Sequence, residues 1–196
     1  MHLKNKILHI GLPEDNKLWE NLKNGDEKAF STLFKNYYNS LVQYGNTFSP
    51  FSEKIQDCVQ DVFTDIWVYR NNLSDSVVVK SYLLSSVRKR IMRLHQKERI
   101  FNQLTPIDEV VFLFDFSIEH QLISDELTAG RVAHLNKLLN ILPPRQKRAL
   151  YLRYYHGLNV EQIAETFDMN YQSANNLLHR ALVNIRKEWN RDLISA

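Results

Sequence analysis

Residues 159–189 of this 196-residue chain read NVEQIAETFDMNYQSANNLLHRALVNIRKEW. Asn159 and Gln162 have the spacing of a capping box, which predicts a short helix over 160–167. After a tight turn, Asn170 is placed to cap a second helix of about seventeen residues. A short helix, a tight turn and a longer helix together predict a helix-turn-helix.

The second of these helices has two different faces. With about 100° between successive residues, its apolar side chains fall within one arc, which predicts the buried face. The arc consists of Ala174, Leu177, Leu178, Ala181, Leu182, Ile185 and Trp189. The opposite face and its flanks carry Gln172, Ser173, Asn175, Asn176, His179, Arg180, Val183, Arg186 and Lys187. Asn and Gln suit adenine and Arg suits guanine or phosphate, so this face is a candidate DNA-reading surface. The same two-helix corner also occurs in proteins that never bind DNA.

Upstream of this stretch, the sequence predicts further helices and a linker. One helix ends at Pro143–Pro144, because proline cannot continue a helix, and the next runs from Arg145 to Tyr155. His156–Gly157 then supplies a left-handed stop. Residues 101–131 lose the helical periodicity and are acidic, so we expect a linker there.

Charge is distributed unevenly along the chain, although its net charge is only +3. Residues 1–79 carry −2, residues 80–100 carry +6, residues 101–139 carry −4 and residues 140–196 carry +3. The basic segments favour a polyanionic partner, and nucleic acid leads because neutralised phosphates release counterions. The alternative is a solvated helix face.

The basic segment 80–100 has the periodicity of an amphipathic helix. Its predicted buried stripe is Leu84, Val87, Ile91 and Leu94. The residues expected largely off that stripe are Arg88, Lys89, Arg93, Gln96 and Lys97. A membrane-surface role is disfavoured because the apolar face carries no Trp or Phe before Phe101.

The helix before it carries an acidic stripe. Its predicted buried face is Ile55, Val59, Val62, Phe63 and Ile66. Asp57, Asp61 and Asp65 recur at every fourth position on another face, and like charges so spaced cost roughly a few tenths of a kcal/mol per pair. We therefore expect a compensating group outside the helix. It is either surface lysines and solvent, or a partner that docks on an acidic and aromatic face including Gln60 and Trp67.

Composition and the remaining N-terminal pattern favour an all-α fold of two small helical domains. An apolar stripe predicts a helix that Asp26 caps, after a shorter helix that Gly25 closes. The chain has only 5 Gly and 5 Pro, which leaves little material for a loop-rich β fold. The single cysteine, Cys58, excludes an intramolecular disulfide and is expected to be buried. No signal peptide or membrane span is recognisable, so we expect a cytoplasmic protein.

No catalytic or metal-binding pattern is present in the sequence. The seven histidines lack a His-Glu-x-x-His spacing, and no Gly-rich phosphate loop occurs. We expect no enzymatic activity, no cofactor and no metal. The histidines expected to lie on the surface or in packing contacts are His95, His134, His156 and His179.

Three motifs, in this order, resemble the extracytoplasmic-function (ECF) sigma factors of bacterial RNA polymerase, within the sigma-70 superfamily. Residues 57–67, DCVQDVFTDIW, resemble region 2.2, and residues 80–84, KSYLL, with the basic helix behind them resemble region 2.4. Residues 142–148, 155–165 and 178–182 resemble region 4. The sequence YQSANNLL at 171–178 is similar to the corresponding stretch in sigma factors of Bacteroidetes.

The resemblance implies a promoter-specific initiation factor that binds core RNA polymerase. It implies sigma region 2 at 12–100, an acidic linker at 101–131 and sigma region 4 at 132–190. Docking on the β′ clamp helices is implied for Asp57, Gln60, Asp61, Phe63 and Trp67. Contacts with the minus-10 promoter element are implied for Arg70, Asn71, Lys80, Tyr82, Arg88, Lys89 and Arg93. Contacts with the minus-35 element are implied for Gln172, Ser173, Asn175, Asn176, His179 and Arg180.

Further partners implied by the resemblance are the β flap of polymerase, promoter DNA and an anti-sigma factor. Two other functions stay open: an autonomous helix-turn-helix regulator, and a helical adaptor that binds only protein. The acidic stripe and the separate basic helix favour the sigma factor over the autonomous regulator, because such a regulator needs neither.

Overall fold

The computed structural model describes residues 13–49, 51–102 and 126–194, and within these ranges the chain forms helices and no strands. The expected all-α fold is therefore confirmed. The N-terminal helices are α1 (Pro13–Lys23), α2 (Glu27–Asn46), α3 (Ser52–Val68), the short 3-10 helix η1 (Arg70–Asn72) and α4 (Val79–Asn102). The C-terminal helices are α5 (Glu126–Asn140), α6 (Pro144–Leu150), the π-helix η4 (Tyr151–Tyr155), α7 (Val160–Phe167) and α8 (Tyr171–Ile194).

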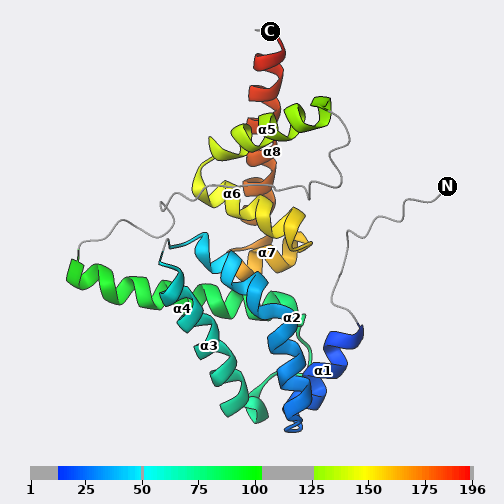
Figure 1. Ribbon diagram of the computed structural model, residues 1–196, viewed down its shortest axis with the longest axis vertical. Coiled ribbons are helices and arrows are strands. Elements are labelled where there is room, and N and C mark those ends of the chain that lie inside the picture. Colours follow the sequence, from blue (N-terminus) through cyan, green and yellow to red (C-terminus); the bar gives the residue numbers. More distant parts are fainter. Residues whose placement is uncertain (1–12, 50, 103–125, 195–196) are drawn as a thin grey trace, which may run out of the picture.

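Helices α1 to α4 form a bundle in which α2 contacts each of the other three (Figure 1). The predicted buried face of α3 is confirmed, since all five of its residues are at most 5% exposed. Leu22, Leu33 and Leu83 join them in the core and are almost fully buried. Burying one such side chain contributes about 1.5–3 kcal/mol, so this apolar core is what holds the four helices together.

Local signals at the helix ends act as predicted. The Asp26 carboxylate accepts hydrogen bonds from the backbone N–H groups of Lys28 and Ala29, and so caps α2. Gly25 takes a left-handed φ of 88°, which ends α1. Helix α4 starts at Val79, slightly earlier than the sequence suggests.

The C-terminal helices begin with a similar set of signals but contain one irregularity. Helix α6 starts at Pro144, and Gly157 stops the following segment with a φ of 70°. The single helix expected from Arg145 to Tyr155 is instead α-helical at first and a π-helix over its last five residues. The backbone N–H of His156 donates to the carbonyl of Tyr151, five residues earlier, at 3.2 Å.

The two groups of helices contact each other directly. Helix α7 packs against α4, and residues of α6 and η4 reach the C-terminal half of α2 (Figure 1). The fully buried Arg148 donates to the carbonyl oxygen of Thr47, and the Tyr155 hydroxyl donates to Oε1 of Gln43 at 2.9 Å. The chain therefore has an interface between its N-terminal and C-terminal parts that no local sequence pattern predicts.

Segment 103–125, most of the expected linker, lies outside the described residues. Helix α5 begins at Glu126, so the last residues of the segment expected to be linker are helical. Helix α8 has 24 residues and is longer than the sequence suggests.

Candidate nucleic-acid and protein interfaces

The corner formed by α7 and α8 is fixed by polar caps. The Asn159 side chain accepts from the Gln162 backbone N–H at 2.8 Å, and the Gln162 side chain accepts from the Asn159 backbone N–H at 2.9 Å. Asp168 ends α7 in the left-handed region, with a φ of 54°. Asn170 then accepts from the Ser173 backbone N–H at 2.8 Å. The helix-turn-helix predicted from these residues is confirmed in its local geometry.

Helix α8 exposes the polar face that the sequence predicts. All six side chains expected to contact the minus-35 element are exposed: Gln172, Ser173, Asn175, Asn176, His179 and Arg180. The Gln172 amide donates to Oδ1 of Asn176 at 3.1 Å, so two of these groups are held side by side. Exposed amides near the start of a recognition-type helix can reach base edges in a major groove.

The opposite face of α8 is narrower than expected. Ala174, Leu178 and Ala181 are buried, but Leu182 is 41% exposed, so its predicted place on the buried face is wrong. The reason is its position on the helix, about 80° around the axis from Ala174 and therefore at the edge of the apolar arc.

Helix α4 presents part of its positive charge to solvent. Lys89 and Arg93 are exposed, whereas Arg88 is only 7% exposed and its guanidinium carbon lies 5.5 Å from the centre of the Phe167 ring. Arg88 was expected off the apolar stripe of α4, and it is nevertheless buried, because α7 covers a second face of that helix. Lys80 is partly buried, and burial lowers the pKa of its ammonium while the Asp15 carboxylate opposes that shift.

The loop between η1 and α4 is anchored to α1 at two points. The Trp19 indole donates to the Ser74 carbonyl at 3.1 Å, and Lys23 forms an ion pair with Asp75. The Trp19 ring also meets the ring of Tyr82 edge to face, with 5.1 Å between centroids. This loop is thus pre-positioned beside the start of α4.

The residues that flank this loop on its N-terminal side differ in exposure. Arg70 lies with its guanidinium carbon 4.6 Å from the Trp67 ring centre, and it donates to the Trp67 carbonyl at 2.7 Å. Asn71 is exposed. Of the residues expected at the minus-10 element, Asn71, Lys89 and Arg93 are therefore the accessible ones, and Arg70, Lys80 and Tyr82 are partly buried.

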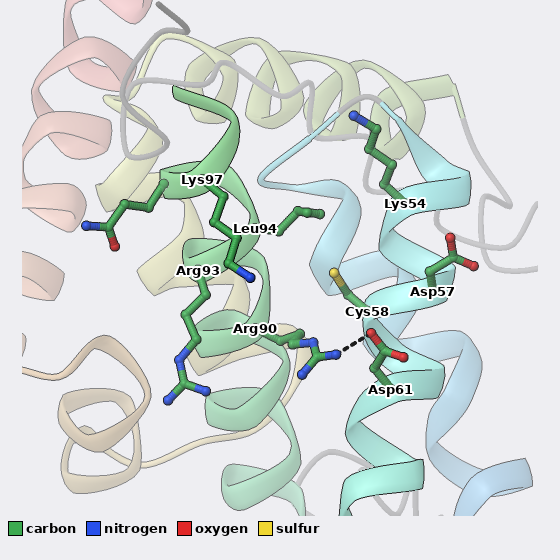
Figure 2. Close-up of a pocket in the computed structure, with 9 residues that line it drawn as sticks. Lys54, Asp57, Cys58, Asp61, Arg90, Arg93, Leu94 and Lys97 are labelled. Carbon is green, nitrogen blue, oxygen red and sulfur yellow. Dashed lines mark hydrogen bonds and ion pairs between the residues drawn. The ribbon is translucent and has the colours of Figure 1, made fainter. Parts of the chain in front are cut away.

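The acidic stripe of α3 faces a groove between α3 and α4 (Figure 2). Asp57, Gln60 and Asp61 are exposed, as a docking face requires. Phe63 is only 2% exposed and packs edge to face on Phe34, so its ring lies beneath that face and not on it. The groove has a volume of about 680 Å³, and its floor includes the buried Cys58.

Arg90 of α4 is the group that compensates the acidic stripe. It donates to Asp61 at 2.5 Å and to Asp65 at 3.4 Å, and Figure 2 shows its guanidinium reaching across the groove to Asp61. The hydrogen bond to Asp61 raises the pKa of the Arg90 guanidinium. Sequence reasoning did not single out this arginine, because the pairing depends on the register between two helices.

The His156 imidazole is buried between Tyr44 and Tyr151, with only 2% of the residue exposed. Burial, helped by the nearby positive charge of Lys80, lowers the pKa of its imidazole to about 3.

The described residues bring no cluster of three or more His, Cys, Asp or Glu side chains together as a metal site would. In the same ranges, no helix combines the length and the apolar content that a membrane span requires.

Comparison with known proteins agrees with this arrangement. Residues 134–185 match the family model described as Sigma-70, region 4. The chain is 23% identical over 176 residues to the RNA polymerase sigma-E factor of Streptomyces avermitilis, covering 88% of this chain and 92% of that protein.

Two solved structures share the fold. One is CnrH in complex with the cytosolic domain of CnrY, with 13% identity, a TM-score of 0.57 and coverage of 91% of this chain and 99% of that one. The other is the sigma factor RpoE of Bartonella quintana in complex with the anti-sigma factor NepR, with 17% identity, a TM-score of 0.57 and coverage of 82% and 96%.

Taken with the helix-turn-helix and the basic and acidic helices, these findings define a sigma-70-type transcription initiation factor whose C-terminal part is a region 4 domain. Within that class, the chain is similar over most of its length to a sigma-E factor, in agreement with the expected resemblance to ECF sigma factors. Its similarity to sigma factors of Bacteroidetes stays a prediction.

Proposed function

We propose that this sigma factor divides its contacts among three helices. Helix α3 docks on core RNA polymerase, α4 and the loop before it engage the minus-10 element, and α8 reads the minus-35 element. The corresponding domain bounds are 12–100 for region 2 and 132–190 for region 4, with 101–131 as the linker. The chain acts by binding alone and has no enzymatic step, because stacked bases and phosphate contacts offset the loss of base pairing.

The observation that carries this proposal is the composition of the exposed face of α8. The six side chains predicted to contact the minus-35 element are all exposed, while Ala174 and Ala181 on the other side are fully buried. A helix whose apolar side is used for packing and whose polar side begins at a capped turn is suited to the major groove.

Polymerase docking is assigned to the exposed part of α3. The contact residues in this proposal are Asp57, Gln60 and Asp61, with Trp67 at the far end of the helix and Phe63 holding the helix against α2 from below. A row of exposed carboxylates favours a basic partner surface, since opposite charges across an interface speed association and fix its register.

The minus-10 contact is assigned to α4 because its exposed cations suit DNA phosphates. Lys89 and Arg93 are accessible for this role, and Asn71 lies in the adjoining loop region. Regulation is assigned to an anti-sigma factor, because two structures with the same fold carry such a partner or a cytosolic partner domain. The proposed place of action is the cytoplasm, where promoters and polymerase are found.

Reconstituted transcription tests the function as a whole. Core polymerase, the purified chain and a pool of genomic promoter fragments are expected to give transcripts with defined start sites, and core polymerase alone is expected to give none from the same fragments. If the chain binds DNA stably but supports initiation at none of them, an autonomous regulator becomes the better reading.

A further inference from the structure

One side of α1 contacts the segment that leads into α4. Asp15, Trp19 and Lys23 follow one another at every fourth position of α1, so their side chains lie along one side of the helix. The Trp19 indole donates to the Ser74 carbonyl, and the Lys23 ammonium pairs with the Asp75 carboxylate. Two of the three side chains thus hold the loop between η1 and α4.

The same side of α1 also reaches the first turn of α4. The Trp19 ring meets the Tyr82 ring edge to face. Burial lowers the pKa of the Lys80 ammonium, and the nearby carboxylate of Asp15, a residue only 5% exposed, opposes that shift. All three side chains on this side of α1 therefore interact with segment 74–82, which joins the loop to the proposed minus-10 helix.

The loop has few contacts of its own to fix its shape. Leu73 and Val77 pack against the core and so fix its two ends. Between them, Ser74, Asp75 and Ser76 are exposed. Within the described part of the chain, no backbone N–H from Ser74 to Val77 donates to a backbone carbonyl. The conformation of the exposed residues therefore depends on the contacts that α1 supplies.

Trp19 supplies the stronger of these contacts and cannot touch DNA itself. It is 3% exposed, and its N–H forms a directional hydrogen bond to a residue 55 positions later in the chain. The Asp75 side chain is 90% exposed, so its ion pair with Lys23 is screened by solvent and contributes less. Any effect of Trp19 on promoter binding therefore has to pass through the loop.

We propose that Trp19 is a positioning residue for minus-10 recognition, assisted by Lys23. This role rests on the proposed function of α4 and the loop before it. A loop held in one conformation presents Ser74–Ser76 ready for binding, so only bases that fit that conformation bind well. A released loop adapts to different bases, which lowers selectivity without removing any group that contacts DNA.

The mobility of the loop tests the positioning role without DNA. A nitroxide label is attached to the full chain at Ser76→Cys, in a Cys58→Ala background that leaves one cysteine. Trp19→Phe keeps an aromatic ring beside Tyr82 but removes the indole N–H, so we expect its electron paramagnetic resonance spectrum to show a more mobile label. Trp189→Phe is the matched control at the contact of α8 with α5, and it is expected to leave the spectrum unchanged. An unchanged spectrum in folded Trp19→Phe would overturn the proposal.

Exchange of the two loop charges is a second test that leaves the core intact. Lys23→Glu places two carboxylates opposite each other and is expected to loosen the loop. Adding Asp75→Lys restores an ion pair of the opposite sense and is expected to restore the parent spectrum at low salt. This pair of variants also decides the matter if Trp19→Phe fails to fold by circular dichroism. A double variant as mobile as Lys23→Glu alone counts against the proposal.

Selectivity is read with core polymerase and one promoter that the parent transcribes, in a barcoded pool with a randomised minus-10 element. By sequencing of the transcripts, Trp19→Phe is expected to lower the preference for the native element over single-base changes several-fold, with the core affinity of the parent. A merely structural role would reduce transcription of all templates by the same factor, and that result overturns the proposal alone. A parent without any minus-10 preference overturns the proposed function of α4 as well.

Discussion

The guanidinium of Arg148 donates two hydrogen bonds to the carbonyl oxygen of Thr47, from Nε at 3.0 Å and from Nη2 at 2.6 Å. Thr47 is the C-terminal cap of α2, so a positive charge lies at the negative end of that helix. Removing the side chain leaves a buried carbonyl without these donors, a loss of about 1–3 kcal/mol. Arg148→Met is therefore expected to lower the free energy of unfolding by about this amount in urea titrations, and Arg145→Met to stay within about 0.5 kcal/mol of the parent. Equal effects of the two changes would contradict a specific role for the buried arginine.

The pH dependence of stability is predicted from His156. Its pKa in the folded protein is about 3, below the ordinary value of 6.5, so the unfolded chain takes up a proton first as the pH falls. Stability is therefore fully present above about pH 6.5 and is lost toward lower pH, at about 1.4 kcal/mol per pH unit. Between about pH 6.5 and pH 5 we expect a loss of roughly 2 kcal/mol in urea titrations. In His156→Phe this part of the pH dependence should vanish; a variant with the parent's slope would assign the effect to other groups.

Two glycines give opposite predictions on substitution by alanine. A Cβ at Gly45 would lie 2.4 Å from Cγ2 of Ile55 and 3.3 Å from Cδ1 of Ile91, within the core between α2, α3 and α4. Overpacking of this kind costs about 1–3 kcal/mol. A Cβ at Gly130 in α5 meets nothing within 4 Å, so Gly130→Ala is expected to stabilise by about 0.5–1 kcal/mol through helix propensity. Thermal unfolding measured by circular dichroism should separate the two variants in opposite directions.

The ion pair of Arg90 with Asp61 allows a direct contact of Asp61 with polymerase to be tested separately from the role of the pair in the fold. If Asp61 contacts polymerase, Asp61→Asn weakens core binding, with a larger effect at low salt because the contact is electrostatic. Arg90→Gln breaks the same ion pair but leaves the carboxylate available, so it is expected to keep or increase the affinity for core polymerase. Titration of fluorescently labelled sigma factor with core enzyme measures both. Equal weakening by the two variants would mean that the ion pair matters only for the fold.

Base reading by α8 predicts two kinds of effect on upstream-element binding. Gln172→Ala and Asn176→Ala each remove an amide suited to adenine, and each is expected to cost about 1–3 kcal/mol of discrimination at one position of the element. Arg180→Ala removes a phosphate contact and is expected to weaken binding evenly across sequences. Selection from a randomised upstream element, read by sequencing bound fragments, distinguishes them. An unaltered sequence preference in the two amide variants would show that another surface reads the element.

Local features of this fold could be predicted from the sequence, because the groups that produce them are neighbours in the chain. The capping box of Asn159 and Gln162 and the cap at Asp26 each need only a few consecutive residues. The exposed face of α8 is equally predictable, since helical periodicity fixes which side chains share a side. Leu182 deviates only because it lies at the edge of the apolar arc.

Long-range features could not be predicted in this way. The burial of Arg88 depends on α7, a helix more than seventy positions later in the chain. The single apolar stripe of α4 predicts one buried face of that helix and gives no sign of a second. The partner of the acidic stripe depends on the register of α3 against α4, which brings Arg90 and not another cation of the basic segment opposite Asp61. Both features arise from how helices are placed, and helix propensity contains no information about placement.

The π-helix at Tyr151–Tyr155 affects how the fold responds to the deletion of one residue. A π-turn accommodates one residue more than the α-helical turn it replaces. Deletion of one residue in this stretch would therefore restore an α-helix and leave the downstream structure at nearly the same rotation about the helix axis, because the wider turn has already absorbed the extra residue. The DNA-reading helix would then keep its direction and its side chains. The π-helix is thus a place where the chain can lose one residue without turning its recognition helix away from DNA.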